Sequence, residues 1–169
     1  MTVAMDGYST AGWTAVFSAL VGASAALTGL LFVSLSINLS HVIQGKGLIG
    51  RAIEVLILLT SVLIVSTLLL MPSQGPGSTG IEILSVAGFE LVLLAIIHVR
   101  APRRALGVSP PMFAMRVTAA QVGPVFMIIG GISLLVQNGG GLYWVVPAMI
   151  VSIVAAIIGA WVMLVEIVR

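Results

Sequence analysis

The sequence predicts an all-α membrane protein, a bundle of five transmembrane helices. Of its 169 residues, 60% are apolar and only 7% are charged, whereas a soluble domain carries roughly 25% charged residues. The apolar residues form continuous runs rather than the alternating pattern of membrane β-strands. Five of these runs are long enough for a transmembrane helix, which needs about 20 residues. A water-soluble fold is therefore excluded.

The five runs form one transmembrane domain that covers residues 1–169, because only short connections separate them. In chain order, we expect the spans at residues 13–39, 50–71, 81–99, 112–136 and 142–168. The first span reaches about 40 Å at 1.5 Å per residue, so it must tilt or project beyond the bilayer. The second ends before Pro72, and the Pro- and Gly-rich segment that follows is expected to be a loop, with a turn at GSTG, residues 77–80.

The fourth span is expected to bend near its middle, at Gly123 and Pro124. Proline removes a backbone donor and clashes with the preceding helical turn, which produces a kink. A broken helix can expose carbonyl groups to an ion, and Gln121, just before the kink, is therefore a candidate for an ion or proton pathway. The alternative is a kinked span without a transport role.

Basic residues fall on one side of the predicted membrane. With five spans, the first and third loops and the C-terminus share a side. That side carries all seven basic residues: Lys46, Arg51, Arg100, Arg103, Arg104, Arg116 and Arg169. By the positive-inside rule this side faces the cytoplasm. We therefore expect the N-terminus outside and the C-terminus in the cytoplasm.

Composition also excludes several classes of function. There are no cysteines and only two histidines, which argues against thiolate metal sites, cysteine nucleophiles and most metal centres. Seven basic residues are too few for a nucleic-acid surface. No nucleophile–base pair and no nucleotide-binding loop is visible. We therefore expect no enzymatic activity, no cofactor, no metal site and no nucleic-acid partner.

Glu90 is the most informative residue. It lies nine residues from each end of the span at 81–99, which is about 13.5 Å from either boundary. A carboxyl group at this depth is costly, and no Lys or Arg is predicted at the same depth to pair with it. It is either part of a proton or cation pathway, or a neutral carboxyl that is hydrogen-bonded to Ser, Thr or Gln on a neighbouring helix.

Two further polar residues lie near the expected cytoplasmic boundary. Glu54 is one turn inside the second span, three residues after Arg51, with which it can form an intrahelical pair. Asn38, near the end of the first span, is expected to meet Glu54 across the hairpin of the first two spans. Together they could form a polar vestibule for an ion, or simply an interhelical hydrogen bond.

The remaining polar residues are expected at the membrane surfaces. Glu82 lies at the start of the third span, where a carboxylate is favoured by the helix dipole. Glu166 and Arg169 have the spacing of an ion pair on one helix. His41 and His98 are both expected near the cytoplasmic surface as interfacial residues.

Small residues predict where helices pack closely, because lipid gives helices no hydrophobic reason to associate. In the first span they recur every seven residues, a spacing that suits left-handed packing. The fifth span offers a second set. The helix-packing candidates are Ala15, Gly22, Gly29 and Ser36 in the first span, and Ala156 and Ala160 in the fifth. These faces could form the core of one chain, the axis of an oligomer or the contact with a partner.

The segments ALTGLLFVSLSINL, RAIEVLILLTSVLIVSTLLLMPSQ and WVMLVEIVR resemble a group of small, largely uncharacterised bacterial membrane proteins, many of them from actinobacteria. The resemblance covers most of the chain. It implies a multi-pass protein of the bacterial cytoplasmic (inner) membrane. Some members of the group are labelled as modulators of the FtsH protease. The resemblance brings no catalytic residues.

These observations favour two functional hypotheses. The first is a homo-oligomeric channel or permeation unit for protons or cations, with Glu90 at the membrane centre and Asn38 and Glu54 in a cytoplasmic vestibule. The second is a non-catalytic accessory or modulator subunit of a larger complex, such as a respiratory enzyme or a membrane protease. The expected partners are the lipid bilayer and either further copies of the chain or such a complex.

Overall fold

The computed structural model describes residues 7–45, 47–100 and 110–168, and this part of the chain is almost entirely helical. It contains no strand, which confirms the predicted all-α fold class. Several residues used in the charge analysis lie outside the described residues: Lys46, Arg103, Arg104 and Arg169. The expected pair of Glu166 and Arg169 is therefore not described either, since the side chains of residues 166–168 are also left out.

Five helices of the described chain are long and apolar enough to cross a membrane, which indicates a multi-pass membrane protein. A short 3-10 helix, Ala11–Trp13, precedes the first of them. The α-helices are α2 (Thr14–Ile37), α3 (Leu39–Gln44), α4 (Leu48–Leu69), α5 (Pro76–Arg100), α6 (Pro110–Val136) and α7 (Leu142–Val168). Only the short helix α3 is not a candidate span.

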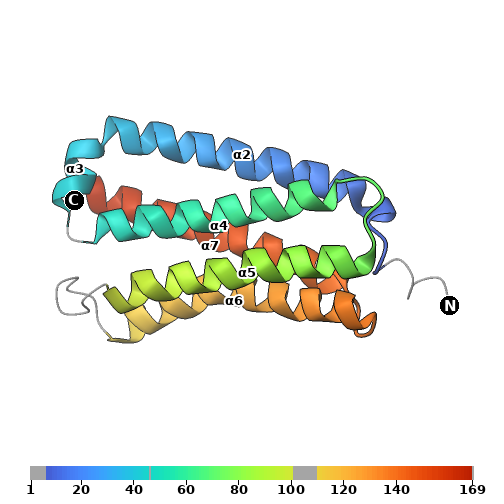
Figure 1. Cartoon of the computed structure of the whole chain (residues 1–169). Helices are drawn as coiled ribbons and strands as arrows, with labels where there is room; N and C mark the ends of the chain where they lie inside the picture. The colour runs from blue at the N-terminus through green and yellow to red at the C-terminus, as the bar shows by residue number, and fades with distance from the viewer. Residues whose placement is uncertain (1–6, 46, 101–109, 169) are drawn as a thin grey trace.

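The five long helices lie roughly parallel or antiparallel to one another, with α4 at the centre (Figure 1). Helix α4 packs against α2, α5 and α7, and α6 packs against α5 and α7. Helix α2 is peripheral, because nearly all of its interhelical contacts are with α4. Arg51, Arg100 and Arg116 lie near the helix ends at which α4 and α6 begin and α5 ends. We call this the basic end of the bundle.

Two helix boundaries differ from the sequence-based expectation. Helix α2 ends at Ile37 because Asn38 leaves the helical conformation, with φ −106° and ψ 20°. Helix α5 begins at Pro76, so GSTG belongs to its first turns and the predicted turn is wrong. Proline suits the first helical position. The hydroxyls of Ser78 and Thr79 each donate to the carbonyl of Gly75 at 2.9 Å, which ties both side chains to the first turn of the helix.

Glycines allow α5, α6 and α7 to approach closely. A Cβ atom placed on Gly80 of α5 would lie 2.9 Å from the carbonyl oxygen of Gly131 on α6. Similarly, a Cβ atom on Gly123 of α6 would lie 3.1 Å from the carbonyl oxygen of Ala148 on α7. Helix α6 continues through Pro124 without a break. The close contacts fix the helices at a defined height relative to one another.

Gly80→Ala is expected to lower the free energy of unfolding in detergent micelles by about 1–3 kcal/mol, because the added methyl group overpacks a backbone contact. The matched control is Gly88→Ala on the same helix, since a Cβ atom there would meet nothing within 4 Å. The control should be neutral or stabilising, because alanine favours helix over glycine by about 1 kcal/mol. Unfolding followed by circular dichroism measures both variants, and equal stabilities would contradict the close contact.

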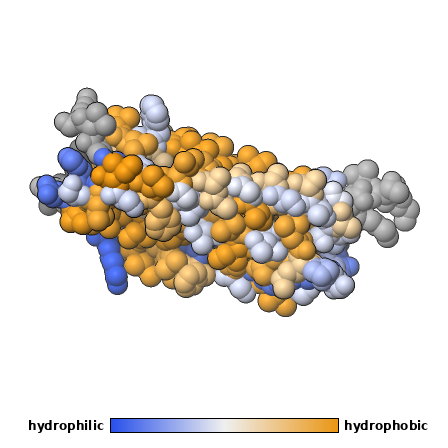
Figure 2. All heavy atoms as spheres, turned by 90° about the horizontal axis from the view of Figure 1, so that it is seen from above, coloured by the Kyte–Doolittle hydropathy of each residue, from blue (hydrophilic) through white to orange (hydrophobic). Residues whose placement is uncertain are grey.

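The outer surface is suited to lipid. Seen from the side of α2, apolar residues cover most of the body, and strongly hydrophilic residues gather toward the ends (Figure 2). Large exposed side chains along the helices include Leu30, Phe32, Phe89 and Trp161. In water such a surface would be an aggregation hazard, whereas in a bilayer it faces hydrocarbon.

Candidate functional site

A layer of polar residues divides the apolar core of the bundle. The buried apolar side chains form two clusters, one toward each end. On α4, Ser61 separates Leu59 of one cluster from Val62 of the other. The same boundary falls at a polar residue on the neighbouring helices. We call the residues Ser24, Ser61, Glu90, Gln121 and Ser152, contributed in this order by α2, α4, α5, α6 and α7, the central polar layer.

Contacts between the helices place Glu90, Gln121 and Ser152 of this layer at one level. Gly80 of α5 meets Gly131 of α6. Glu90 follows Gly80 on α5 by as many residues as Gln121 precedes Gly131 on α6. Because α5 and α6 are antiparallel, Glu90 and Gln121 lie at the same height in the bundle. Gly123, two residues beyond Gln121, meets Ser152 of α7. Three helices therefore bring polar side chains to the middle of the bundle.

Glu90 is the ionisable member of the layer. Its residue is only 1% exposed, and neither carboxyl oxygen has a hydrogen-bond partner among the described residues. The Ser61 hydroxyl faces the carboxyl, but it donates to the carbonyl of Leu58 at 3.0 Å. No cation of the described chain faces Glu90. The carboxyl group is thus buried without a basic partner among the described residues, and the Ser61 hydroxyl of a neighbouring helix lies beside it.

Other groups of the layer are also only partly satisfied. The side-chain oxygen of Gln121 and the hydroxyl of Ser152 are buried without a hydrogen-bond partner. Ser24 is satisfied within α2, since its hydroxyl donates to the carbonyl of Leu20 at 2.7 Å. Pro124 has no N–H, so the carbonyl of Ala120 lacks its helical donor. Buried polar groups are normally paired, and such a concentration of exceptions in one layer points to function or to bound water.

A second polar cluster lies closer to the basic end. Glu54 of α4 accepts hydrogen bonds from Arg116 of α6, at 3.0 Å from Nε and from the Nη2 group. The Nε2 atom of His98 on α5 lies 3.5 Å from the same carboxylate oxygen. The side chains of Glu54, Arg116 and His98 are 9%, 20% and 7% exposed. Three helices are therefore joined by one buried carboxylate.

Sequence reasoning did not identify Arg116 as the partner of Glu54. The sequence nevertheless contained a pattern that could have identified this partner. Helices α4 and α6 both start at the basic end, and Glu54 and Arg116 lie the same number of residues after the starts of their helices, Leu48 and Pro110. Opposite charges at equal depth on neighbouring helices are expected to pair, because a lone charge in the membrane is costly.

His98 is not an interfacial residue as expected. Its ring lies inside the bundle, with its edge toward Phe113 at a centroid distance of 6.4 Å and an interplanar angle of 85°. Neither ring nitrogen makes a hydrogen bond within the described residues. The inward position places the imidazole beside the buried Glu54 carboxylate, which needs polar neighbours inside the bundle.

Asn38 and Glu54 are not brought together. The amide of Asn38 donates to the carbonyl of Ser34 at 3.0 Å, and the interactions described for Glu54 are with α5 and α6. The reason is local, because the backbone N–H of Asn38 also donates to the carbonyl of Ser34, and both bonds hold this residue at the end of its own helix. The expected vestibule of Asn38 and Glu54 therefore does not form in the described structure.

The small-residue candidates divide into two groups. Ala156 on α7 is buried, and Ala160 packs against the same core cluster. The candidates on α2 are exposed, and a Cβ atom on Gly22 or Gly29 would meet nothing within 4 Å. The exposed set is Ala15, Gly22, Gly29 and Ser36. This face of α2 therefore makes no contribution to the core of a single chain.

Glu82 lies away from both clusters. Its two carboxylate oxygens each accept a hydrogen bond from the Gln74 amide at 3.0 Å. Gln74 belongs to the segment between α4 and α5. Glu82 thus anchors this connection near the start of α5, and it serves below as a control carboxyl group outside the central polar layer.

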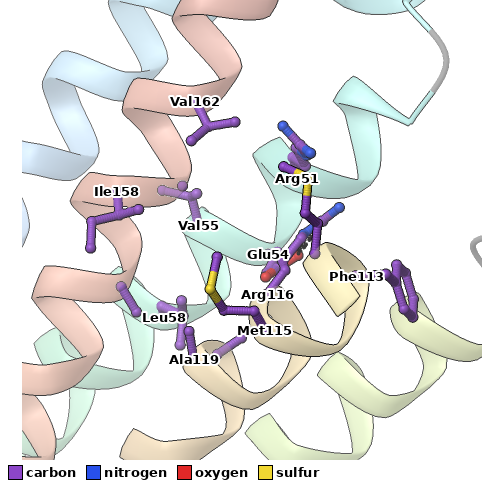
Figure 3. A pocket seen from close by; sticks show the side chains of 14 residues that line it. Arg51, Glu54, Val55, Leu58, Phe113, Met115, Arg116, Ala119, Ile158 and Val162 are labelled. Atoms are coloured by element: carbon purple, nitrogen blue, oxygen red, sulfur yellow. Dashed lines mark hydrogen bonds and ion pairs between the residues drawn. The ribbon is translucent and has the colours of Figure 1, made fainter. Parts of the chain in front are cut away.

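A cavity of about 310 Å³ adjoins the second polar cluster (Figure 3). It lies between α4, α6 and α7, and the Glu54–Arg116 pair forms part of its wall. The other lining side chains are mainly apolar. Figure 3 shows Val55, Ile158 and Val162 on one side of the pair, with Phe113 turned away on the other.

Comparison with models of protein families, with curated proteins and with solved structures finds no match. The chemistry of the site therefore has to be argued from its own groups. A carboxyl group can take up and release a proton at Glu90, and an imidazole can do so at His98. Among the described residues, no three acidic or histidine side chains gather as a metal-binding group would require.

Proposed function

We propose that the chain is a permeation unit for protons, with Glu90 as the central proton-binding site. The observation that carries the proposal is the Glu90 carboxyl, which is buried at the middle of the bundle with neither oxygen hydrogen-bonded among the described residues. Ionisable residues inside a membrane are costly and mark proton relays and ion pathways. A carboxyl group that stabilised the fold would instead be expected to have its hydrogen bonds satisfied.

The proposal favours protons over metal cations. Hard cations need about six or more oxygen ligands, several of them charged. The central polar layer supplies one carboxyl group, an amide and hydroxyls, and Glu90 is its only acidic residue. A proton needs only a single oxygen atom. The layer therefore matches a proton-binding site better than a site for a bare cation.

The proposed route toward the basic end runs from Glu90 to His98 and Glu54. Glu90 and His98 lie about 12 Å apart along α5, at 1.5 Å per residue. Direct transfer requires hydrogen-bond distance, so water molecules must bridge this gap. Leu94 lies between them on α5 and is fully buried. Proton passage therefore requires a movement that admits water past Leu94.

The route lies within one chain rather than between copies. Glu90 is 1% exposed in a single chain, so its carboxyl does not lie on a surface that an oligomer could close into a pore. Self-association would instead use the exposed small residues of α2. In this proposal each copy of a homo-oligomer in the bacterial cytoplasmic membrane carries its own proton site.

The test is proton flux into proteoliposomes under an imposed potassium diffusion potential. Wild-type protein is expected to conduct protons, and Glu90→Gln is expected to lose at least about 90% of the flux, because an amide cannot take up and release a proton at neutral pH. A pH-sensitive dye trapped in the vesicles measures the flux. The matched control is Glu82→Gln, since Glu82 is hydrogen-bonded to Gln74 away from the layer.

The control variant should retain the wild-type flux. Equal flux from wild type and Glu90→Gln would remove Glu90 from the pathway. No flux from wild-type protein, reconstituted with its helical content intact, would overturn permeation altogether.

A second candidate function is that of an accessory or modulator subunit. The exposed small-residue face of α2 favours it, because Gly22 and Gly29 leave room for a close helix contact that the single chain does not use. In this case the purified chain should conduct no protons and should copurify with a larger membrane complex in fixed proportion. The flux assay therefore separates the two candidates.

A further inference from the structure

Of the buried hydroxyl groups in the described residues, only that of Ser152 lacks a hydrogen-bond partner. Ser152 lies on α7 and is 1% exposed. A serine inside a helix can donate to a carbonyl of the preceding turn, as Ser24 and Ser61 do. The other buried hydroxyls are also paired, namely those of Ser66, Thr79 and Ser133. Ser152 is therefore an exception that calls for an explanation.

The Ser152 side chain lies against α6. A Cβ atom on Gly123 would lie 3.2 Å from the Cβ atom of Ser152 and closer still to its hydroxyl oxygen, so glycine leaves the place that this hydroxyl occupies. The same turn of α6 holds the carbonyl of Ala120, which lacks its helical donor because Pro124 has no N–H. An unpaired hydroxyl on α7 and an unpaired carbonyl on α6 therefore lie close to one another.

Helices α4, α5, α6 and α7 form a closed ring, since each packs against the next and α7 packs against α4. In this ring α5 and α7 stand opposite each other. Neighbouring helix axes are about 8–10 Å apart, so opposite axes are about 13 Å apart. Glu90 of α5 and Ser152 of α7 are thus buried from opposite sides of the ring, and neither makes a hydrogen bond to the other.

A second contact supports the common height of these two residues. The Ser66 hydroxyl of α4 donates to the sulfur of Met149 on α7 at 3.6 Å. Ser61 lies five residues before Ser66, and on antiparallel helices this corresponds to five residues after Met149, which is two residues from Ser152. Two residues are about 3 Å along a helix. Since Ser61 lies beside Glu90, the hydroxyl of Ser152 and the carboxyl of Glu90 lie in one layer.

The surroundings of this layer suit a bound water molecule. Buried alanines lie within one turn of it on three helices of the ring: Ala87, Ala120 and Ala156. Such side chains take up less room between the helices than the leucines and methionines of the two apolar clusters. A buried water molecule makes about three hydrogen bonds. The Ser152 hydroxyl, the Ala120 carbonyl and the Glu90 carboxyl supply three partners.

We infer that a water molecule bridges Ser152 and Glu90 across the ring, and that Ser152 is a positioning residue for proton transfer at Glu90. This inference rests on the proposed permeation function. The water molecule accepts a hydrogen bond from the Ser152 hydroxyl and donates to the Ala120 carbonyl and to the Glu90 carboxyl. A proton that arrives at this water is passed to the Glu90 carboxylate, which leaves a neutral water molecule and a neutral carboxyl group. Release is the reverse step.

Infrared spectroscopy tests the bridge without any flux measurement. The spectrum of wild type minus that of Glu90→Gln, recorded at low pH, isolates the carbonyl stretching band of the protonated Glu90 carboxyl. A carboxyl that loses a hydrogen bond absorbs at higher frequency, so Ser152→Ala is expected to raise the frequency of this band. The matched control is Ser24→Ala, because the equally buried Ser24 hydroxyl donates to the carbonyl of Leu20 on α2, outside the ring. The control should leave the band in place.

Proton flux into proteoliposomes tests the positioning role. Ser152→Ala is expected to lower the wild-type flux by about tenfold, the upper range for the loss of one neutral hydrogen bond. Ser152→Thr should keep most of the flux, because threonine retains the hydroxyl. Ser24→Ala should keep the wild-type flux.

The two measurements separate this inference from the proposed function. An unchanged band in Ser152→Ala, or an equal shift in Ser24→Ala, would overturn the water bridge even if Glu90 proves essential for flux. Wild-type flux in Ser152→Ala, or equal losses in Ser152→Ala and Ser152→Thr, would overturn the positioning role. If the wild-type protein conducts no protons, the proposed function and the positioning role both fail, while the infrared comparison still decides whether the bridge exists.

Discussion

Arg116→Gln is expected to lower the free energy of unfolding in detergent micelles by about 3 kcal/mol, because it leaves the buried carboxylate of Glu54 without its guanidinium partner. Removing one partner of a buried ion pair costs about 3–5 kcal/mol. We expect the lower end of this range because the Arg116 side chain retains 20% exposure. Unfolding in mixed micelles of increasing dodecyl sulfate content, followed by circular dichroism, measures the loss.

The double variant Glu54→Gln/Arg116→Gln should recover part of this loss. It removes both charges, so no uncompensated carboxylate remains near the apolar core. Arg100→Gln is the control, since Arg100 is exposed at the end of α5 and should change the free energy of unfolding by less than about 0.5 kcal/mol. A double variant as unstable as the sum of the two single variants would show that the pair has no coupling energy.

Much of the fold could be predicted from the sequence because the membrane imposes a simple requirement. A helix that crosses hydrocarbon needs a continuous apolar run, and five such runs gave the five long helices. The central position of Glu90 also followed from counting along its span. The depth of a residue in the membrane depends on its position along the span, and this position can be counted in the sequence.

The orientation of each helix about its own axis could not be predicted in the same way. In a soluble protein the buried face of a helix is apolar and the exposed face is polar. In a bilayer both faces are apolar, since lipid and core are alike in polarity. The small-residue face of α2 and the glycines of α5 and α6 therefore have the same sequence signature. However, Gly80, Gly123 and Gly131 lie at helix contacts of the single chain, whereas Gly22 and Gly29 do not.

The partners of the candidate site were likewise hidden from sequence analysis. Arg116, which bonds to Glu54, is 62 residues away along the chain, so closeness in sequence did not point to it. Only the order of the helices in space brings α4, α5 and α6 to one carboxylate. Equal depth narrows the choice of partners, but it does not determine which helices are neighbours.

Glu90→Leu is expected to raise the free energy of unfolding by about 1–3 kcal/mol, the cost of a buried polar group that lacks a hydrogen-bond partner. Leucine has a similar size and suits the surrounding apolar clusters, which contain Ala87 and Leu94 on the same helix. Glu90→Gln should bring no comparable gain, because the amide keeps polar groups in the same place. The same unfolding assay in mixed micelles measures both variants.

This result would distinguish the two interpretations of Glu90 that the sequence leaves open. A carboxyl group that is hydrogen-bonded to a neighbouring helix stabilises the bundle, so its replacement by leucine would lower the free energy of unfolding. A carboxyl group kept for proton transfer is a cost to the fold, so its replacement stabilises the protein and abolishes proton flux. Ser85→Ala is the control, since the exposed Ser85 hydroxyl donates to the carbonyl of Ile81 on its own helix and its loss should change the stability little.

The combination of higher stability and lost flux carries more weight than either result alone. A variant that merely disrupts the bundle would lose both stability and flux. The contrast arises because burial in hydrocarbon makes an unsatisfied carboxyl unfavourable at every pH, as a charged group through desolvation and as a neutral group through its missing hydrogen bonds. A gain in stability at Glu90 would therefore measure the energy that the fold gives up in order to hold a proton-binding group at the centre of the membrane.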